Sequence, residues 1–505
     1  MAKTNLTYNV EDKPSWGKTI IFAFQQLLAI LAATIAVPAI IGHGMSPAAA
    51  LFGAGAGTLV YLLFTKFKSP VFLGSSFAFI APMLAAFGGA VSMAAGYLGL
   101  IIGAILAGLV YVILALIVKF VGNGWITKFM PAVVIGPTVA IIGLSLAGNA
   151  VGDLLSGSYY VEVTETVSGV VESLDNLANV TSSTLLPDGL YYATYDVTSS
   201  VLATNTWIAL VCGLVTLFGT IIVSVYGVRL QKMIPFVIGI LLGYIVAAIF
   251  TGIGWLSGVD ALKVIDFGKF AHMEWYPNFT FITAFNGFKD FASVGDFFTY
   301  FGVLAVAYVP VAFVVFAEHI ADHKNLGSII GRDLLEEPGL HRTLLGDGIG
   351  SMAGAFFGGC PNTTYGESVG TVAISGNASI RTIFVTALMA MVLAFVGPFS
   401  TFLSTIPNCV MGGVCIALYG FIAVSGLKMI QPIDLSDNRN LFVVSAILIA
   451  GIGGLTLTID KVTLTAVACA LILGILINVA VNFTRWKKHI DERANVEEEQ
   501  PEAEG

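Results

Sequence analysis

Many separate apolar segments, each long enough to cross a lipid bilayer, constrain the fold of this chain most strongly. A membrane-spanning helix needs roughly 20 consecutive apolar residues. Measured against that length, the 505 residues contain about fourteen such segments. Their predicted limits are 19–41, 47–65, 72–90, 92–118, 129–151, 205–227, 233–256, 298–321, 341–358, 362–378, 382–400, 407–427, 441–458 and 462–484. The chain is therefore predicted to be an all-α polytopic membrane protein.

The shortage of charge supports a lipid environment. Charged residues make up 11% of the chain, whereas about 25% is usual for a soluble protein. The five cysteines show no CxxC or zinc-ligand spacing, and no P-loop or dinucleotide motif is complete. We therefore expect no metal, no cofactor, no nucleic-acid partner and no enzymatic activity. A membrane enzyme would need a nucleophile, base or metal constellation near one surface, and the sequence offers none.

The distribution of basic residues predicts the orientation of the chain. If the N-terminus is cytoplasmic, loops after even-numbered spans are cytoplasmic too. All but four of the 23 Lys and Arg residues then lie at or beside the cytoplasmic side, and the exceptions are Lys263, Lys269, Lys289 and Lys461. This is the positive-inside pattern of membrane proteins. Both termini are therefore predicted to be cytoplasmic.

Two long polar stretches lie outside the predicted spans. The stretch 152–204 has no Lys or Arg and seven acids, which are Asp153, Glu162, Glu165, Glu172, Asp175, Asp188 and Asp196. It is predicted to be an extracellular acidic loop with strand character in the run YYVEVTETV. Residues 485–505 start basic and end acidic, which predicts a cytoplasmic tail without fixed structure.

The third and tenth spans are predicted to be discontinuous. They contain the runs FLGSSFAFIAPM (72–83) and GGCPNTTYGESVGTVAISG (358–376). In each run, small hydroxyl residues suited to a short extended stretch precede apolar helix-forming sequence. Broken segments at matching places in two halves indicate a binding site near the middle of the membrane. The alternative is a pair of glycine-rich helices that pack closely against their neighbours.

Carboxylate side chains within predicted spans are the strongest candidates for chemistry. Glu367 lies in the tenth span, and Glu318 lies near the end of the eighth, with Asp322 one helical turn later. Burial disfavours the charged form of a carboxyl group. Glu318 is therefore predicted to carry a proton, with Asp322 beside it and His319 and His323 flanking this face. The alternative is a solvated helix end, and for Asp322 and the histidines the two interpretations stay open.

The run GGCPNTTYGESVGTVAISG resembles the signature of the nucleobase–ascorbate transporters, also called nucleobase–cation symporters. The match is close to the bacterial uracil permeases. Supporting similarity is spread over residues 15–485, in AATIAVP (32–38), LGSSFAFIAPM (73–83), FAEHIADH (316–323), EPGLHR (337–342) and IALYGFIAVSG (416–426). The string PNTTYGE is the most specific part.

The resemblance implies fourteen spans in two inverted repeats of seven. It implies a core domain from spans 1–4 and 8–11, a gate domain from spans 5–7 and 12–14, and a homodimer in the cell inner membrane. The expected division is a tail at 1–18, core spans 1–4 and gate span 5 at 19–151, the acidic loop at 152–204, gate spans 6–7 at 205–256, an extracellular loop at 257–297, core spans 8–11 at 298–400, gate spans 12–14 at 401–484 and the tail at 485–505.

Functional positions carry over one at a time. Glu318 resembles the glutamate of the eighth span that contacts the base, and Glu367 resembles the motif glutamate that holds it. Phe77 and Gly366 resemble the positions whose backbone amides face the ligand. The remaining matches are two residues that line the pocket and one aromatic residue of the gate, namely Ala33, Tyr365 and Tyr419.

This sequence departs from the family pattern at three places. Gln26 stands where the family often has His, Ser368 follows the motif acid where Asn is common, and Asp322 stands where uracil permeases tend to have His. The first two are expected to change hydrogen bonding near the pocket, and the third bears on the proton path. Glu367, rather than Gln, favours uracil over xanthine or urate, whereas Gly376, where some uracil permeases have Arg, weighs slightly against it.

The leading hypothesis is a proton-coupled symporter that imports uracil through the lipid bilayer. One alternative is a carrier of xanthine or another purine in the same family. A second alternative is an anion transporter on the same fold, which needs a neutral or cationic site. The two acids at the predicted site, Glu318 and Glu367, argue against an anion.

Overall fold

The computed structural model describes residues 6–122, 124–125, 130–171, 178–186, 191–228, 230–459 and 462–498. Several residues named in the predictions lie outside these ranges. They are Glu172, Asp175 and Asp188 of the acidic loop, Lys461, and the end of the tail at 499–505.

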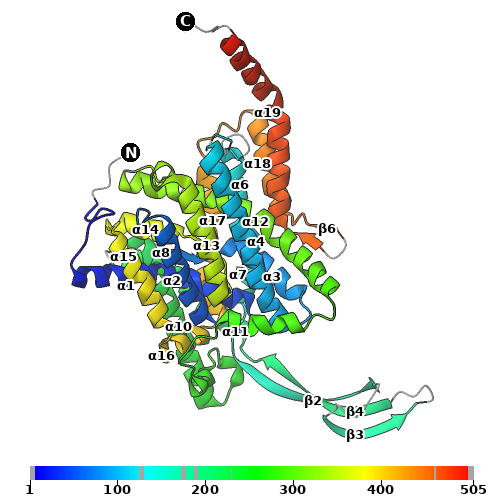
Figure 1. The fold of residues 1–505 in the computed structure, drawn as a ribbon. Coiled ribbons are helices and arrows are strands. Elements are labelled where there is room, and N and C mark those ends of the chain that lie inside the picture. The colour runs from blue at the N-terminus through cyan, green and yellow to red at the C-terminus, as the bar shows by residue number, and fades with distance from the viewer. Residues whose placement is uncertain are drawn as a thin grey trace.

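Long helices form most of the structure, and they follow the apolar segments (Figure 1). In chain order they are α1 (Trp16–Ile41), α2 (Pro47–Phe64), α4 (Met93–Val121), α6 (Ala132–Ser145) with α7 (Ala147–Leu154), α8 (Thr206–Tyr226), α10 (Pro235–Ser257), α12 (Val294–Ile330), α13 (Leu340–Gly358), α15 (Ile380–Leu393), α16 (Gly397–Thr405), α17 (Asn408–Ile430), α18 (Asn438–Ile452) and α19 (Ala466–Glu498). The prediction of a polytopic helical membrane protein is confirmed.

The number of full-length spans is smaller than predicted. In the described part of the chain, nine helices are long and apolar enough to cross a membrane, and the pair α15–α16, bent by 84°, makes a tenth. The predicted third and tenth spans are short helices that follow strands, the predicted ninth is the 19-residue helix α13, which is not among the nine, and the predicted thirteenth is the 15-residue helix α18. The count of fourteen therefore stays a prediction.

The two broken spans are discontinuous, as predicted, and they meet each other. Strand β1 (Leu73–Ser75) pairs antiparallel with β5 (Asn362–Thr364), with Gly74 opposite Thr363. β1 leads into the 3₁₀ turn η1 (Phe77–Phe79) and helix α3 (Ile80–Gly88), and β5 leads into α14 (Gly366–Ser375). The pairing brings the starts of two short helices together inside the helical bundle.

Close backbone contact between α2 and α13 holds the strand pair in place. A Cβ atom on Gly53 would lie 2.5 Å from the carbonyl oxygen of Gly354, and one on Gly57 would lie 2.6 Å from that of Gly350. Small residues allow helices in membranes to approach this closely. The Nδ2 of Asn362 donates to the carbonyl of Gly53 at 2.9 Å, which anchors β5 to α2.

A three-stranded antiparallel sheet projects from the helical body on the side opposite both termini (Figure 1). Its strands are β2 (Tyr160–Val171), β3 (Ala178–Leu185) and β4 (Tyr191–Leu202), in the order β2-β4-β3. The predicted strand character of the acidic loop is confirmed. The position of this sheet agrees with the expectation that loop and termini lie on opposite sides of the membrane.

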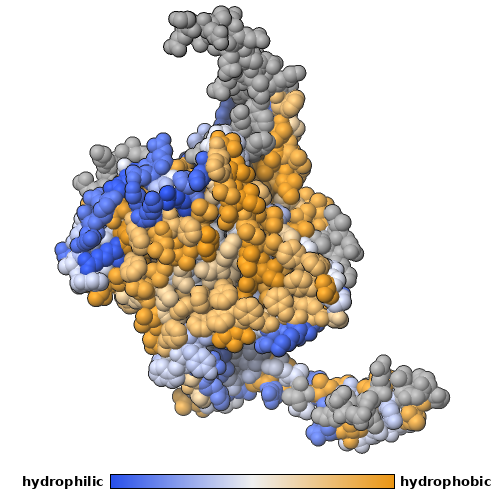
Figure 2. All heavy atoms as spheres, viewed as in Figure 1, coloured by the Kyte–Doolittle hydropathy of each residue, from blue (hydrophilic) through white to orange (hydrophobic). Residues whose placement is uncertain are grey.

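The surface shows where lipid meets the protein. Figure 2 shows an apolar band across the middle of the molecule, with hydrophilic residues above and below it. Most residues of α8 and α10 are not buried inside the protein, and Trp207, Ile222 and Ile249 are each more than half accessible. The prediction of an unstructured tail from residue 485 is wrong as far as Glu498, because α19 continues as a helix to that residue.

Candidate functional site

A cavity of about 360 Å³ lies between two groups of helices. One wall comes from α1, η1, α12, β5 and α14, which belong to the predicted core. The other wall comes from α6, α8, α10, α17 and the short helix α9 (Leu230–Met233), which belong to the predicted gate. At one end the cavity reaches Ser224, Lys232 and Met429, near the α8–α10 connection and the end of α17.

Helix α12 presents one polar face to this cavity. Glu318, Ala321, Asp322 and Asn325 all line it. Their spacing of three and four residues places them on one side of an α-helix. The helix continues beyond the predicted end at residue 321 to Ile330, so Glu318 and Asp322 lie within it rather than at a frayed terminus.

The start of α14 faces the same cavity. Tyr365, Gly366 and Glu367 line it, and no side chain caps the first N–H groups of the helix. The first N–H groups of any helix have no partner within it. The Oγ1 of Thr364 donates to Oδ2 of Asp322 at 2.7 Å, which ties this end of β5 to α12. Backbone donors and a carboxylate therefore stand side by side at the cavity wall.

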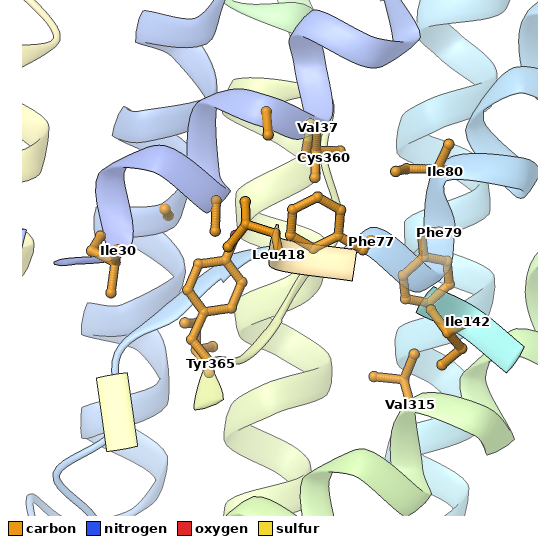
Figure 3. Close-up of a cluster of buried hydrophobic side chains, with 14 of the residues drawn as sticks. Ile30, Val37, Phe77, Phe79, Ile80, Ile142, Val315, Cys360, Tyr365 and Leu418 are labelled. Atoms are coloured by element: carbon orange, nitrogen blue, oxygen red, sulfur yellow. The ribbon is translucent and has the colours of Figure 1, made fainter. Parts of the chain in front are cut away.

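An apolar group closes the cavity on the side of β1. Phe77 lines the cavity, and its ring meets the ring of Tyr419 edge to face, with 5.5 Å between centroids. Figure 3 shows Phe77 and Tyr365 gathered with Leu418 in this cluster. The hydroxyl of Tyr365 donates to the carbonyl of Ser75 at 2.7 Å, so this ring also bridges the two strands.

The structure gathers most, but not all, of the predicted site residues. Five of the predicted substrate-binding residues line the cavity, together with the predicted proton-coupling residue Asp322; the five are Phe77, Glu318, Tyr365, Gly366 and Glu367. Ala33 and Tyr419 are buried and do not line the cavity in this conformation. Tyr419 supports Phe77 from behind.

Helix α12 carries a second polar network on its other side. His319 Nδ1 lies 2.7 Å from Oδ2 of Asp347, and its Nε2 lies 2.9 Å from the hydroxyl of Thr343. His323 Nε2 lies 2.6 Å from the hydroxyl of Tyr61. Both histidines are almost fully buried. The solvated alternative is therefore wrong for them, and they join α12 to α13 and α2.

Sequence reasoning did not single out several of the polar residues at the cavity. Among the cavity-lining residues that the structure describes, Lys232 is the single cation, and Thr364 and Asn325 add polar groups. Thr364 was within the recognised motif but carried no predicted role. No group of three or more His, Cys, Asp or Glu side chains in the described residues is arranged to hold a metal ion.

Two of the three departures from the family pattern contact each other. The Nε2 of Gln26 donates to Oγ of Ser368 at 2.7 Å, and the backbone N–H of Phe72 donates to the same oxygen at 3.2 Å. Both polar side chains are buried. One hydroxyl therefore joins α1, the residue before β1 and α14 at the position next to Glu367. Sequence reasoning found both positions but could not pair them, because 342 residues separate them.

Substitutions at these two positions are expected to be coupled. Gln26→His and Ser368→Asn each leave a buried polar group without its present partner, at a cost of about 1–3 kcal/mol. The double variant restores the family pair. Its effect on the free energy of unfolding should therefore differ from the sum of the two single effects by about 0.5–3 kcal/mol. Unfolding temperatures of the four proteins in detergent measure this. Thr138→Val, which removes a bond within α6, is the matched control and should be additive with Ser368→Asn.

Comparison with known proteins agrees with this geometry. The family model Xan_ur_permease, described as Permease family, matches residues 17–182 and 189–460. The uracil permease of Bacillus caldolyticus is 37% identical over 93% of this chain and 94% of the relative. The uracil permease of Bacillus subtilis (strain 168) is 34% identical over 95% and 96%, and that of Escherichia coli (strain K12) is 32% identical over 94% and 93%.

Solved structures share the fold at low sequence identity. The transmembrane domain of a cyanobacterium bicarbonate transporter, BicA, superposes with a TM-score of 0.55 at 14% identity, covering 93% of this chain and 99% of that one. The murine anion transporter Slc26a9, in its inward-facing state, superposes with a TM-score of 0.58 at 14% identity, covering 94% and 69%. The family match over nearly the whole chain leaves one assignment: this multi-pass membrane protein is a permease, not an enzyme, and belongs to the nucleobase–ascorbate transporter family.

Proposed function

We propose that this protein is a proton-coupled symporter that imports uracil across the cytoplasmic membrane. The observation that carries the proposal is the cavity wall at the start of α14, where Glu367 stands beside uncapped backbone N–H groups. The names of the relatives support uracil as the substrate.

The chemistry of the wall fits a planar ring with alternating carbonyl and N–H groups. The carboxylate of Glu367 accepts an N–H of the base, and the backbone N–H of Gly366 donates to a carbonyl. Phe77 offers an apolar ring face for the plane of the base. Ala33 and Tyr419, which do not line the cavity here, would join the site as the core and gate approach each other.

The cavity is proposed to open toward the cytoplasm in this conformation. Among the residues that line it, Ser224, Lys232 and Met429 lie beside the α8–α10 connection and near the end of α17. Both places adjoin loops that the positive-inside pattern assigns to the cytoplasm. Both termini would then be cytoplasmic, and movement of the core group against the gate group would expose the site outside. The exposed faces of α8 and α10 would meet lipid or a second copy in a homodimer.

Glu318 and Asp322 are proposed to couple the proton to the base. Both face the cavity from α12, and a protonated carboxyl can donate where an ionised one only accepts. Protonated Glu318 can donate a hydrogen bond to a carbonyl of the base. In this form it is uncharged while the core group moves against the gate group. Coupling requires that the two protonation states bind the solute differently.

Two other substrates remain alternatives. A purine such as xanthine shares the alternating donors and acceptors, and the cavity volume of about 360 Å³ does not exclude it. An anion is favoured only by the fold shared with BicA and Slc26a9. Three carboxyl groups on the cavity wall, from Glu318, Asp322 and Glu367, oppose an anion because like charges repel.

Competition uptake tests the substrate. In proteoliposomes with acid outside, unlabelled uracil should abolish uptake of labelled uracil, because both occupy the same wall of donors and acceptors. Xanthine, hypoxanthine and sulfate at equal concentration should leave most of it. Strong competition by xanthine or hypoxanthine would transfer the assignment to a purine, and competition by sulfate would transfer it to an anion.

Glu367→Gln should weaken uracil binding. The substitution replaces an acceptor by a mixed donor and acceptor, which leaves a mismatch of about 1–3 kcal/mol in a partly buried site. The dissociation constant should rise at least roughly tenfold, since that factor equals about 1.4 kcal/mol. Calorimetry on the purified protein measures it, and Ile374→Leu, on the same cavity wall, is the control. Unchanged affinity in Glu367→Gln would remove this residue from the site.

Glu318→Gln should separate binding from coupling. The amide imitates the protonated carboxyl permanently, so the variant should bind uracil and lose the pH dependence of binding seen in the wild type. It should also fail to accumulate uracil against a gradient when the outside of proteoliposomes is acidic. Continued accumulation by Glu318→Gln would contradict its role and make Asp322 the next candidate.

A further inference from the structure

The segment before α1 is bonded to the far end of the helix that carries Glu367. The backbone N–H groups of Thr7 and Tyr8 both donate to the carbonyl of Gly376, at 2.7 and 3.1 Å. The N–H of Ala378 donates in return to the carbonyl of Tyr8 at 2.9 Å. Gly376 is the residue that ends α14, and it has a left-handed backbone with φ of 64°.

The same segment continues along the connection from α14 to α15. The N–H of Ile380 donates to the carbonyl of Val10 at 3.1 Å, and the hydroxyl of Ser379 donates to the carbonyl of Asp12 at 2.6 Å. We call residues 6–12 the N-terminal clasp. A chain of backbone bonds thus joins it to residues that directly follow α14.

An ion pair fastens the clasp to a third element. Glu11 forms a bidentate ion pair with the guanidinium of Arg332, which lies in the connection between α12 and α13. The Arg332 guanidinium lowers the pKa of the Glu11 carboxyl, so the pair stays charged at neutral pH. Exposed ion pairs contribute little by themselves. The backbone bonds at Gly376 are therefore the main attachment.

Helix α14 has a physical need for this attachment. It has 10 residues, and helices this short are marginal without tertiary contacts. The last carbonyl groups of a helix have no partner within it. At its other end, the helix must hold Gly366 and Glu367 in one orientation at the cavity. A helix that frays or tilts at Gly376 would move that end as well.

We propose that the N-terminal clasp fixes the end of α14 and thereby positions Gly366 and Glu367 for the solute, and that the backbone N–H groups of Thr7 and Tyr8 provide this positioning. The inference rests on the proposed function for the ligand and for the place where it binds. The hydrogen bonds and the ion pair of the clasp described above all go to elements of the predicted core. The clasp therefore travels with the core group and does not bridge it to the gate.

A matched pair of substitutions at one position tests the clasp. Thr7→Pro removes the N–H that donates to Gly376, whereas Thr7→Ala keeps it. If loss of the clasp contact leaves α14 in the binding orientation in about one tenth of the molecules, the dissociation constant for uracil rises about tenfold in Thr7→Pro. Thr7→Ala should bind like the wild type. A charge exchange at Asp260 and Lys263, an ion pair in the connection that follows α10, should also leave affinity unchanged.

A reversible crosslink then supplies the rescue. Tyr8 and Asn377 are Cα partners in an isolated parallel bridge, so Tyr8→Cys with Asn377→Cys should form a disulfide. The five native cysteines are buried, which limits side reactions. In the Thr7→Pro background, oxidation should restore affinity to within about twofold, and reduction should reverse it on the same sample. The unfolding temperature, measured in parallel, separates positioning from a general loss of stability.

Several outcomes would overturn the proposal. Absence of the crosslink in the otherwise unchanged chain would show that the clasp does not dock on Gly376. Equal affinities for Thr7→Pro and Thr7→Ala would show that docking does not position the site. Should Thr7→Pro not fold, removal of residues 2–12 replaces it, and unchanged affinity there is equally decisive. If the wild type does not bind uracil, the proposed substrate fails, and the nucleobase that wins the competition assay becomes the probe of the clasp.

Discussion

Backbone hydrogen bonding inside the membrane is the constraint on which this structure depends. The chain leaves helical geometry at β1 and β5, and no lipid can satisfy the backbone groups exposed there. The two strands satisfy each other by antiparallel pairing, with Leu73 opposite Thr364. The small residues of α2 and α13 allow those helices to enclose the pair. The starts of η1 and α14 can then lie in the middle of the bundle, where residues of both line the cavity.

Helix α12 separates two polar environments. The face with Glu318 and Asp322 lines the cavity, and the adjacent positions His319 and His323 lie in a network with Asp347 and Tyr61. A rotation of about 100° per residue places neighbouring residues on different sides of a helix. The same short run therefore supplies both the carboxyl groups that face the cavity and the buried contacts that fix the position of α12. One helix therefore connects the buried histidine network to the carboxyl groups at the cavity.

Contacts outside the cavity hold α14 at both ends. Ser368, next to Glu367, joins α14 to α1 and to Phe72, which precedes β1, and the N-terminal clasp reaches the other end of α14. The short helix is thus held at both ends by segments from the first 80 residues of the chain. Each hydrogen bond is modest in water-exposed surroundings, and breaking a buried one costs more because no water replaces the partner.

The sequence alone determined the membrane environment, the broken third and tenth spans, the family and six of the residues that line the cavity, namely Phe77, Glu318, Asp322, Tyr365, Gly366 and Glu367. Hydropathy, charge and the PNTTYGE string are properties of short stretches of sequence, so they are visible without the tertiary structure. Tertiary structure decided the rest. It shortened α18, bent α15 against α16, buried His319 and His323, placed Ala33 and Tyr419 behind the wall, paired Gln26 with Ser368 and docked residues 6–12 on Gly376. These features depend on which distant segments pack together, and hydrogen-bond partners hundreds of residues apart leave no local pattern.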